Sequence, residues 1–170
     1  RDPVNQTTRY TYGLATFPHY LTEIADPRGV RAVRNEYDDD GRLVATIDAD
    51  GHRIAYTHDI DGRTEQVRDR RGNLTQYVYD DNGWVLAETN ALGETTQHTY
   101  DANGNELTRT DPLGHVTVWT YDVRGNALTE TNALGQTTTS TYDGRNSLLT
   151  QADAMGRTVI ANTYHPRINA

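Results

Sequence analysis

The chain has 170 residues, of which only 35% are hydrophobic, and Tyr, with 11 residues, supplies most of its aromatic side chains. The formal net charge of −8 argues against nucleic-acid binding, because phosphate contacts need clustered Lys and Arg. No apolar run approaches the ~20 residues of a membrane helix, and the lack of Cys excludes disulfides and thiol chemistry.

The sequence repeats itself every 21 residues. Each unit has Tyr, or once His, followed by Asp, and in most units Gly stands three residues after the Asp. The positions are Tyr37, Asp38 and Gly41; His58, Asp59 and Gly62; Tyr79, Asp80 and Gly83; Tyr100, Asp101 and Gly104; Tyr121, Asp122 and Gly125; and Tyr142 and Asp143, with Asn146 in place of Gly. Six occurrences in one register predict a repeat architecture.

A second glycine column lies between these signals. Its members are Gly51, Gly72, Gly93, Gly114, Gly135 and Gly156, each with Asp or Asn three residues earlier. Both signals place Asp or Asn first and Gly fourth, as in a type I β-turn. We expect the Asp side chains to hydrogen-bond the turn backbone, so each unit contains two tight turns.

The segments between the turns have strand composition. Segments such as Thr95–Tyr100, Val116–Tyr121 and Thr137–Tyr142 are rich in Thr, Tyr, Trp and Val, and no segment shows a sustained helical period. Two strands per unit predict an all-β fold of tandem antiparallel β-hairpin repeats. About 14 strands would form one large sheet, which we expect to curve, as a section of a β-shell does.

The pattern weakens at both ends. We divide the chain into a degenerate first repeat (1–30), regular 21-residue repeats (31–157), and an irregular terminal repeat or chain end (158–170). Tyr164 falls one residue late and is followed by His165 instead of Asp. Because Arg1 is not followed by an apolar signal-peptide core, we expect the chain to be cut from a longer one.

Strand alternation assigns side chains to faces. Tyr56, Tyr77, His98 and Trp119 precede a grid Tyr or His by two residues and are expected beside it. Two apolar columns also run through the units: Val44, Leu86, Leu107, Leu128 and Leu149, interrupted by Glu65; and Leu92, Leu113, Leu134 and Met155. Stacked neighbouring units are expected to bury these columns.

Three phrases carry a resemblance to a known family. Tyr-Asp-Asp-Asp-Gly-Arg-Leu (37–43), Tyr-Asp-Ala-Asn-Gly-Asn (100–105) and Thr-Asp-Pro-Leu-Gly (110–114) resemble the YD repeat of RHS proteins. The resemblance implies a section of a hollow β-shell. In bacterial RHS proteins and toxin-complex subunits such a shell encloses a C-terminal toxin, and teneurins use a related shell in adhesion. It also implies a secreted or cell-surface protein whose partners are neighbouring repeats and an enclosed toxin domain.

The self-cleavage motif of bacterial RHS shells has the form Asp-Pro-x-Gly-Leu. Here Asp111-Pro112-Leu113-Gly114 is followed by His115, and Asp26-Pro27-Arg28-Gly29 is followed by Val30. Neither segment matches fully, and both fall where the repeat requires a turn. We therefore assign no cleavage site.

No residue is assigned to catalysis, a cofactor or a metal. Equivalent Asp residues of successive units would lie ~10 Å apart, which is too far to share one ion. The acidic runs 38–40, 48–50 and 59–61 lack EF-hand spacing, and they read as solvated turns. The histidines lack zinc spacing, and no nucleophile elbow surrounds Ser140 or Ser147. We therefore expect a protein without enzymatic activity. The alternative hypothesis is an enzyme whose active site is embedded in the repeats.

An aromatic β-surface also suits sugar rings. Tyr56, Tyr77 and Trp119 are therefore candidates for ligand contact, and an adhesion or carbohydrate-binding surface is the alternative function. The two outer strands of such a sheet leave backbone groups unpaired, so edge-to-edge self-association is a further expectation.

Overall fold

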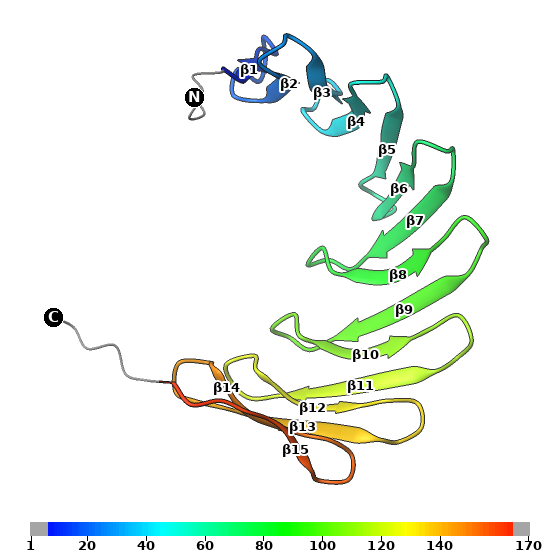
Figure 1. Ribbon diagram of the computed structural model, residues 1–170. Helices are drawn as coiled ribbons and strands as arrows, with labels where there is room; N and C mark the ends of the chain where they lie inside the picture. Colours follow the sequence, from blue (N-terminus) through cyan, green and yellow to red (C-terminus); the bar gives the residue numbers. More distant parts are fainter. Residues whose placement is uncertain (1–6, 165–170) are drawn as a thin grey trace, which may run out of the picture. The chain divides into compact units, whose positions relative to one another are not determined.

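The computed structural model describes residues 7–164, which form 15 β-strands joined into one open antiparallel sheet (Figure 1). Strand order follows chain order. The strands are β1 (Arg9–Tyr12), β2 (Leu21–Ala25), β3 (Arg31–Tyr37), β4 (Leu43–Asp48), β5 (Arg53–Asp59), β6 (Thr64–Arg68), β7 (Leu74–Tyr79), β8 (Val85–Thr89), β9 (Thr95–Tyr100), β10 (Glu106–Thr110), β11 (Val116–Tyr121), β12 (Ala127–Thr131), β13 (Thr137–Tyr142), β14 (Leu148–Ala152) and β15 (Thr158–Ala161). The predicted all-β repeat fold is confirmed, and this part of the chain holds no helix long and apolar enough to cross a membrane.

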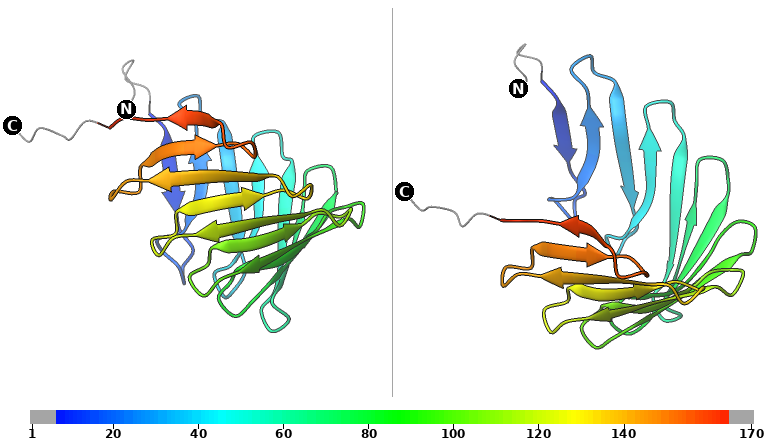
Figure 2. Two further views of the ribbon diagram at one scale, coloured as in Figure 1. Left: turned by 90° about the horizontal axis from the view of Figure 1, so that it is seen from below. Right: turned by 60° about the horizontal axis from the view of Figure 1, so that its bottom comes forward.

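Contacts divide the chain into two compact units. The first unit contains the residues up to Val78 together with Thr89–Gly93, and the second contains Tyr79–Glu88 together with the residues from Glu94 onward. Within each unit, neighbouring strands are rotated relative to one another (Figure 2), as the right-handed twist of β-strands requires. The division into segments 1–30, 31–157 and 158–170 stays a prediction about sequence regularity, and residues 165–170, including His165, lie outside the described part.

The hairpin turns have one common geometry, which the Asp101 turn illustrates. Gly104 N donates to Asp101 O at 3.2 Å, and Asp101 N donates to Asn105 O at 2.9 Å. Gly104 has a φ of +86°, in the left-handed region that side chains disfavour. This is a type I turn followed by a left-handed residue, which is the common three-residue hairpin loop.

Two of the turns that follow a Tyr-Asp or His-Asp grid position, which we call first-column turns, depart from this geometry. Asn146 takes the place of Gly with a φ of +65°, a conformation that Asn tolerates better than most residues. The prediction that Gly62 completes a turn like the others is wrong. The left-handed residue there is Arg63, with a φ of +51°, and Gly62 N instead donates to Asp59 Oδ1 at 2.9 Å. Because β5 and β6 pair without a register shift, this hairpin needs a longer loop.

The first apolar column marks a β-bulge. In β9–β10, Glu106 pairs with Tyr100 and Thr108 pairs with Thr99, so Leu107 is the extra residue. The same shift leaves Val44, Leu128 and Leu149 unpaired. The β5–β6 hairpin, in which Glu65 interrupts the column, has no bulge. The first apolar column therefore marks the positions at which one strand of the hairpin has an extra residue and a stronger twist.

Within each unit the sheet is a single layer with very little core. Among the described residues, the buried hydrophobic side chains are Ala45 and Ile47, which are 0% and 6% exposed. The expectation that stacked units bury the second apolar column is wrong: Leu92, Leu113 and Leu134 are each 82% exposed and Met155 is 79% exposed. These residues stand third in their turns, beyond the strand ends, where adjacent strands do not cover them.

An irregular segment packs onto the sheet near the start of the chain. Between β1 and β2, Phe17 stacks on Tyr20, with ring centroids 5.0 Å apart, and Tyr20 contacts the ring of Tyr37 at 5.2 Å. A Cβ added to Gly41 would lie 2.9 Å from the Phe17 ring. Trp84 covers Gly104 in the same way, at 2.9 Å, and its ring lies 5.6 Å from that of Tyr100. Large rings therefore lie on two of the glycines that follow the Tyr-Asp grid positions, Gly41 and Gly104.

Alanine at Gly104 should destabilise the fold more than alanine at Gly114. Gly114 has a φ of +84° and open space around it, so G114A adds only left-handed strain of about 1–2 kcal/mol. G104A adds the same strain and a clash with Trp84, worth about 1–3 kcal/mol more. Urea unfolding followed by circular dichroism measures both. Equal losses would show that the Trp84 contact does not constrain the turn.

Candidate ligand-contact face

The sheet of the second unit has two chemically different faces. On β11, Thr117, Trp119 and Tyr121 are half-buried, whereas Val116, Val118 and Thr120 alternate with them and are exposed. We call the side that carries Trp119 and Tyr121 the ring face. On the opposite side, Thr120 Oγ1 lies 2.6 Å from Thr129 Oγ1, and this threonine pair recurs as Thr99–Thr108 and Thr141–Thr150. Strand alternation therefore sorts the side chains as predicted.

The tyrosines of the repeat grid tie neighbouring strands together through their hydroxyl groups. Tyr121 Oη donates to Glu106 O at 2.8 Å, and Tyr142 Oη donates to Ala127 O at 3.1 Å. In each case the acceptor stands 15 residues earlier. In the first unit Tyr37 Oη donates to Leu21 O at 2.9 Å. The grid aromatic is therefore both a packed ring and a hydrogen-bond donor.

His58 takes over this function where Tyr is missing. Its Nε2 lies 2.8 Å from Leu43 O, again 15 residues earlier, so the imidazole donates from Nε2. Its Nδ1 lies 3.0 Å from Glu65 Oε2. The sequence places His58 at a grid position of Tyr, and the structure shows that it keeps the hydrogen bond.

A charged cluster occupies the ring face of the second unit. Glu106 accepts from His98 Nδ1 at 2.6 Å and from Arg109 Nη2 at 3.2 Å. The Arg109 guanidinium lies 4.8 Å from the centroid of the Trp119 ring, a cation–π contact. Burial raises the pKa of Glu106, but the hydrogen bonds from Arg109 and His98 outweigh it, and the net pKa lies below the ordinary value. Burial and the Glu106 charge raise the pKa of Tyr100.

This cluster borders an open hollow of about 480 Å³. Its lining residues are Glu88, Thr96, His98, Tyr100, Glu106 and Arg109. A smaller hollow of about 120 Å³ lies beside Trp119 and is also lined by Glu130, Ser140, Tyr142 and Gln151. Both combine aromatic edges with hydrogen-bonding groups, as sugar sites do, but neither contains a nucleophile held by a base.

The sequence candidates for ligand contact fall in both units. Tyr56 pairs with Val67 and Tyr77 pairs with Glu65, so both rings lie on one face of the first unit, on either side of β6. Trp119 belongs to the second unit. All three side chains are half-buried and not freely exposed. Their role as ligand contacts therefore stays a prediction.

Sequence reasoning missed Glu106 and Arg109. The aligned positions one unit later are Ala127 and Glu130, so charge at Glu106 and a positive charge at Arg109 depart from the repeat. That departure was the available signal. The structure shows that the two residues meet His98 and Trp119 from the neighbouring strands.

The predicted bonding of the Asp side chains to the turn backbone is confirmed. Asp122 Oδ1 accepts from Arg124 N and from Asn126 N, both at 2.9 Å, and Oδ2 accepts from Asn126 Nδ2 at 2.8 Å. These donors lower the pKa of Asp122, the side-chain amide of Asn126 most strongly. The pKa is lowered likewise at Asp26, Asp38, Asp48, Asp69, Asp80, Asp101, Asp111, Asp143 and Asp153.

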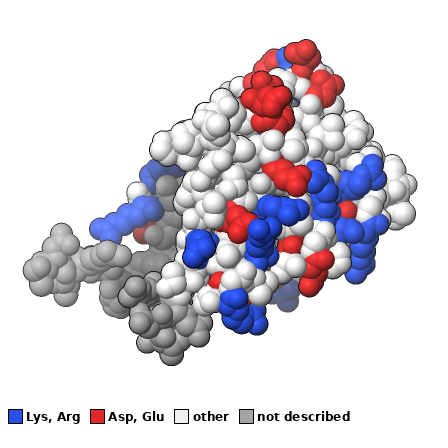
Figure 3. All heavy atoms as spheres, turned by 90° about the horizontal axis from the view of Figure 1, so that it is seen from above, with Lys and Arg blue, Asp and Glu red and all other residues white. Residues whose placement is uncertain are grey.

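One acidic cluster has metal-like proximity, but its Asp48 carboxylate is already bound by other groups of the chain. Ligand atoms of Asp48, Asp50 and His52 lie within 4.8 Å of one another. Asp48 Oδ2, however, forms an ion pair with Arg70 at 2.8 Å, and its Oδ1 accepts from the backbone of Asp50 and His52. Figure 3 shows acidic and basic side chains next to one another over the lower part of one face, and a mainly acidic group at its upper end. We therefore assign the cluster to turn stabilisation.

The two Asp-Pro segments are ordinary turns. Gly114 N donates to Asp111 O at 3.0 Å, and Gly29 N donates to Asp26 O at 2.9 Å. Both aspartates also accept backbone N–H groups through Oδ1. This geometry matches the turns elsewhere in the array and adds nothing specific to cleavage.

The RHS repeat family model matches residues 37–74, 79–116 and 100–137, which together span more than half of the sequence. The chain belongs to the RHS repeat family. No curated protein matches the sequence significantly.

Solved structures extend the comparison to the fold of this RHS repeat array. The crystal structure of TcdB2-TccC3 matches with a TM-score of 0.65 at 16% identity, over 94% of this chain and 10% of that chain. TcdB2-TccC3 without its hypervariable C-terminal region gives 0.40 at 16% identity, over 86% and 11%. The Tc holotoxin pore of Photorhabdus luminescens gives 0.30 at 14% identity, over 89% and 13%. The first match shows a shared fold, and this chain spans about a tenth of that protein.

Removing one grid hydroxyl should weaken the array by a small, defined amount. Tyr121→Phe keeps the ring but leaves Glu106 O without its donor, at a cost of about 0.5–1.5 kcal/mol. Tyr10→Phe is the matched control, because the Tyr10 ring is mostly exposed on the outer strand β1. Urea unfolding compares the two variants. An unchanged midpoint for Tyr121→Phe would contradict a stabilising role for the hydroxyl.

The turn aspartates should make stability fall in acid. Because their folded-state pKa values lie below the ordinary 3.8, their contribution is complete above about pH 4 and is lost as pH falls through the folded values. Urea midpoints measured from pH 7 to pH 2.5 should therefore drop below pH 4. Asp122→Asn should reduce the drop, since Asn132 already makes the same two backbone bonds without a charge. A midpoint independent of pH would refute this account.

Proposed function

We propose that this RHS repeat array is a section of shell wall, which encloses a C-terminal toxic segment of a longer polypeptide and acts without catalysis. The observation that carries the proposal is that the sheet of each compact unit is a single layer. A globular domain buries a substantial core, whereas the described residues here contain two buried hydrophobic side chains. Such a sheet suits a partition between two compartments.

The mechanism would be steric. Antiparallel strands joined by ladder hydrogen bonds leave no gap for a polypeptide to pass, and tight turns close the ends of each hairpin. The shared fold with part of TcdB2-TccC3 and the membership in the RHS family support a wall section of this kind. A secreted or toxin-complex setting follows from the same proposal, with the neighbouring repeats and the enclosed segment as partners.

The charged and aromatic groups of the ring face would serve the wall and not a reaction. His98, Glu106 and Arg109 bind one another, and the grid tyrosines bind backbone carbonyls. A general base needs a reacting group within hydrogen-bond reach, and here the available partners are structural. This engagement supports the expectation of a protein without enzymatic activity.

Protease access to the longer polypeptide tests enclosure. One variant carries a protease recognition site inserted after Val123, whose turn position is fully exposed, and a second carries the same site in the C-terminal segment. The first should be cut rapidly in the native state. The second should be cut at least ~100-fold more slowly until the protein is unfolded, because opening of the wall limits access. Equal rates of cleavage would rule out enclosure.

A carbohydrate-binding surface is the second candidate. The hollow beside Trp119 and the larger one lined by Tyr100, Glu106 and Arg109 favour it, because aromatic faces flanked by polar groups suit sugar rings. A glycan array probed with the chain and with Trp119→Ala separates the candidates. Binding that is lost in Trp119→Ala would support this function, and no binding by the unaltered chain would remove it.

A further inference from the structure

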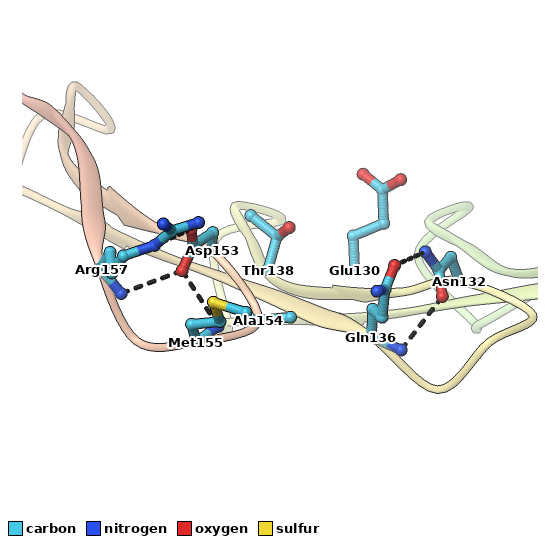
Figure 4. A pocket seen from close by; sticks show the side chains of 8 residues that line it. All are labelled: Glu130, Asn132, Gln136, Thr138, Asp153, Ala154, Met155 and Arg157. Atoms are coloured by element: carbon cyan, nitrogen blue, oxygen red, sulfur yellow. Dashed lines mark hydrogen bonds and ion pairs between the residues drawn. The ribbon is translucent and has the colours of Figure 1, made fainter.

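Two hollows of the second unit share two residues of the ring face. The hollow of about 120 Å³ beside Trp119 and a second hollow of about 310 Å³ are both lined by Glu130 and Thr138. These two residues are direct cross-strand partners on β12 and β13. Figure 4 shows the second hollow, with Thr138 between the turn that carries Arg157 and the turn that carries Gln136. The two hollows therefore adjoin along β13 and form one groove, which we call the β13 groove.

Alternate residues along β13 supply polar side chains to the groove. They are Gln136, Thr138, Ser140 and Tyr142, and each lines one hollow or the other. Residues two apart in a strand are separated by ~6.8 Å, so this row extends over ~20 Å. The backbone of β13 is paired with β12 on one side and with β14 on the other. A ligand in the groove is therefore recognised through side chains and not through the backbone.

The preceding hairpin shows why the groove is open. There Arg109 binds Glu106 at 3.2 Å and covers the Trp119 ring, so these three side chains close the ring face. One unit later the aligned residues are smaller or of opposite charge: Ala127, Glu130 and Ser140. The ion pair and the large ring are thus both missing from the later hairpin, and their space remains as a hollow.

Hydrogen-bonding groups are free at the centre of the groove and fixed around it. Within residues 7–164, the Glu130 carboxylate and the Thr138 hydroxyl make no hydrogen bond or ion pair to another side chain. Beside them, Asn132 Nδ2 donates to Gln136 Oε1 at 2.9 Å, which holds the flanking amide in place. A carboxylate accepts on both of its oxygens, so Glu130 can bind two hydroxyl groups of one ligand.

We propose that the β13 groove binds a linear neutral glycan that lies along β13 and is several sugar rings long. The carboxylate, hydroxyl and amide groups suit sugar hydroxyls, and the rings of Trp119 and Tyr142 suit the apolar faces of sugars. The unpaired charge of Glu130 and the net charge of −8 repel acidic glycans.

An extended peptide fits this groove less well than a glycan does. A peptide that binds a sheet as an added strand needs an exposed edge, and β13 has a neighbour on both sides. The proposal rests on the carbohydrate-binding candidate, which it deepens by naming the groove and the ligand class. It does not depend on the wall function.

Calorimetric titration with linear oligosaccharides tests the length of the site. The probes are neutral β-1,4-linked cello- and chito-oligosaccharides, from disaccharide to hexasaccharide, with oligogalacturonate as the acidic counterpart. The dissociation constant should fall at least about tenfold from disaccharide to hexasaccharide, because the longer ligand fills more of the groove. Oligogalacturonate should not bind. Equal affinities for the short and long neutral ligands would overturn the proposal.

A tryptophan that fills the groove tests its position. Ser140→Trp introduces the residue that the preceding repeat has at the aligned place, and should weaken hexasaccharide binding at least about tenfold. Thr139→Trp is the matched control, because Thr139 is exposed and pairs with Thr129 on the opposite face, so binding should stay unchanged. Circular dichroism checks that both variants keep the β-fold. Glu130→Gln should weaken binding about fivefold, since hydrogen bonds to a charged acceptor are the stronger ones.

The remaining outcomes separate this groove from the function on which it rests. Glycan binding that both Ser140→Trp and Glu130→Gln leave unchanged would overturn the groove and leave the carbohydrate candidate standing. Binding of reduced, carboxymethylated lactalbumin, an unfolded polypeptide, in place of glycans would also overturn it. Failure of the unaltered chain to bind any neutral glycan would remove the groove and the carbohydrate candidate together.

Discussion

Most regular hairpins among the described residues are closed by one side-chain oxygen that accepts two backbone N–H groups, from the residues two and four positions later. In the Asp101 turn the donors are Asn103 and Asn105, at 2.8 and 2.9 Å, and in the Asn132 turn they are Leu134 and Gln136. Because the sheet has almost no core, these turns fix the strand register that packing fixes in other folds. The glycine or asparagine that follows then completes the loop.

The rest of the architecture depends on that fixed register. Once the turns are set, the grid aromatic of one strand reaches a carbonyl 15 residues earlier, and Tyr121, Tyr142 and His58 all make this bond. Strand alternation then brings threonines to one side and rings to the other. A repeat with a 21-residue period thereby builds the same contacts in successive hairpins without a hydrophobic interior.

Most of this could be predicted from sequence because the signals are local. Asp-x-x-Gly defines a turn within four residues, and the strands between turns show their composition directly. Contacts that join residues about 20 positions apart were not predictable, since no local pattern records them. Trp84 over Gly104 and Phe17 over Gly41 belong to this class. The exposure of Leu113 was mispredicted because apolar residues normally indicate burial, whereas its position in the turn places it beyond the strands.

At the candidate site, strand alternation predicted that Trp119 and Tyr121 share one face of the sheet. The contacts of Glu106 with His98 and Arg109 were not predictable, because they join side chains of different strands.

Each 21-residue repeat contains an even number of strands, and this has a consequence for how such arrays change in length. A 21-residue unit contains two strands and two turns, so the chain leaves it in the same direction, and at the same ends of the strands, as it entered. Duplication or loss of one unit therefore preserves which face every later side chain occupies, whereas gain or loss of a single strand would reverse the direction of every later strand. Recombination between units is thus structurally silent, and a gene that encodes such an array can lengthen or shorten its product in steps of 21 codons.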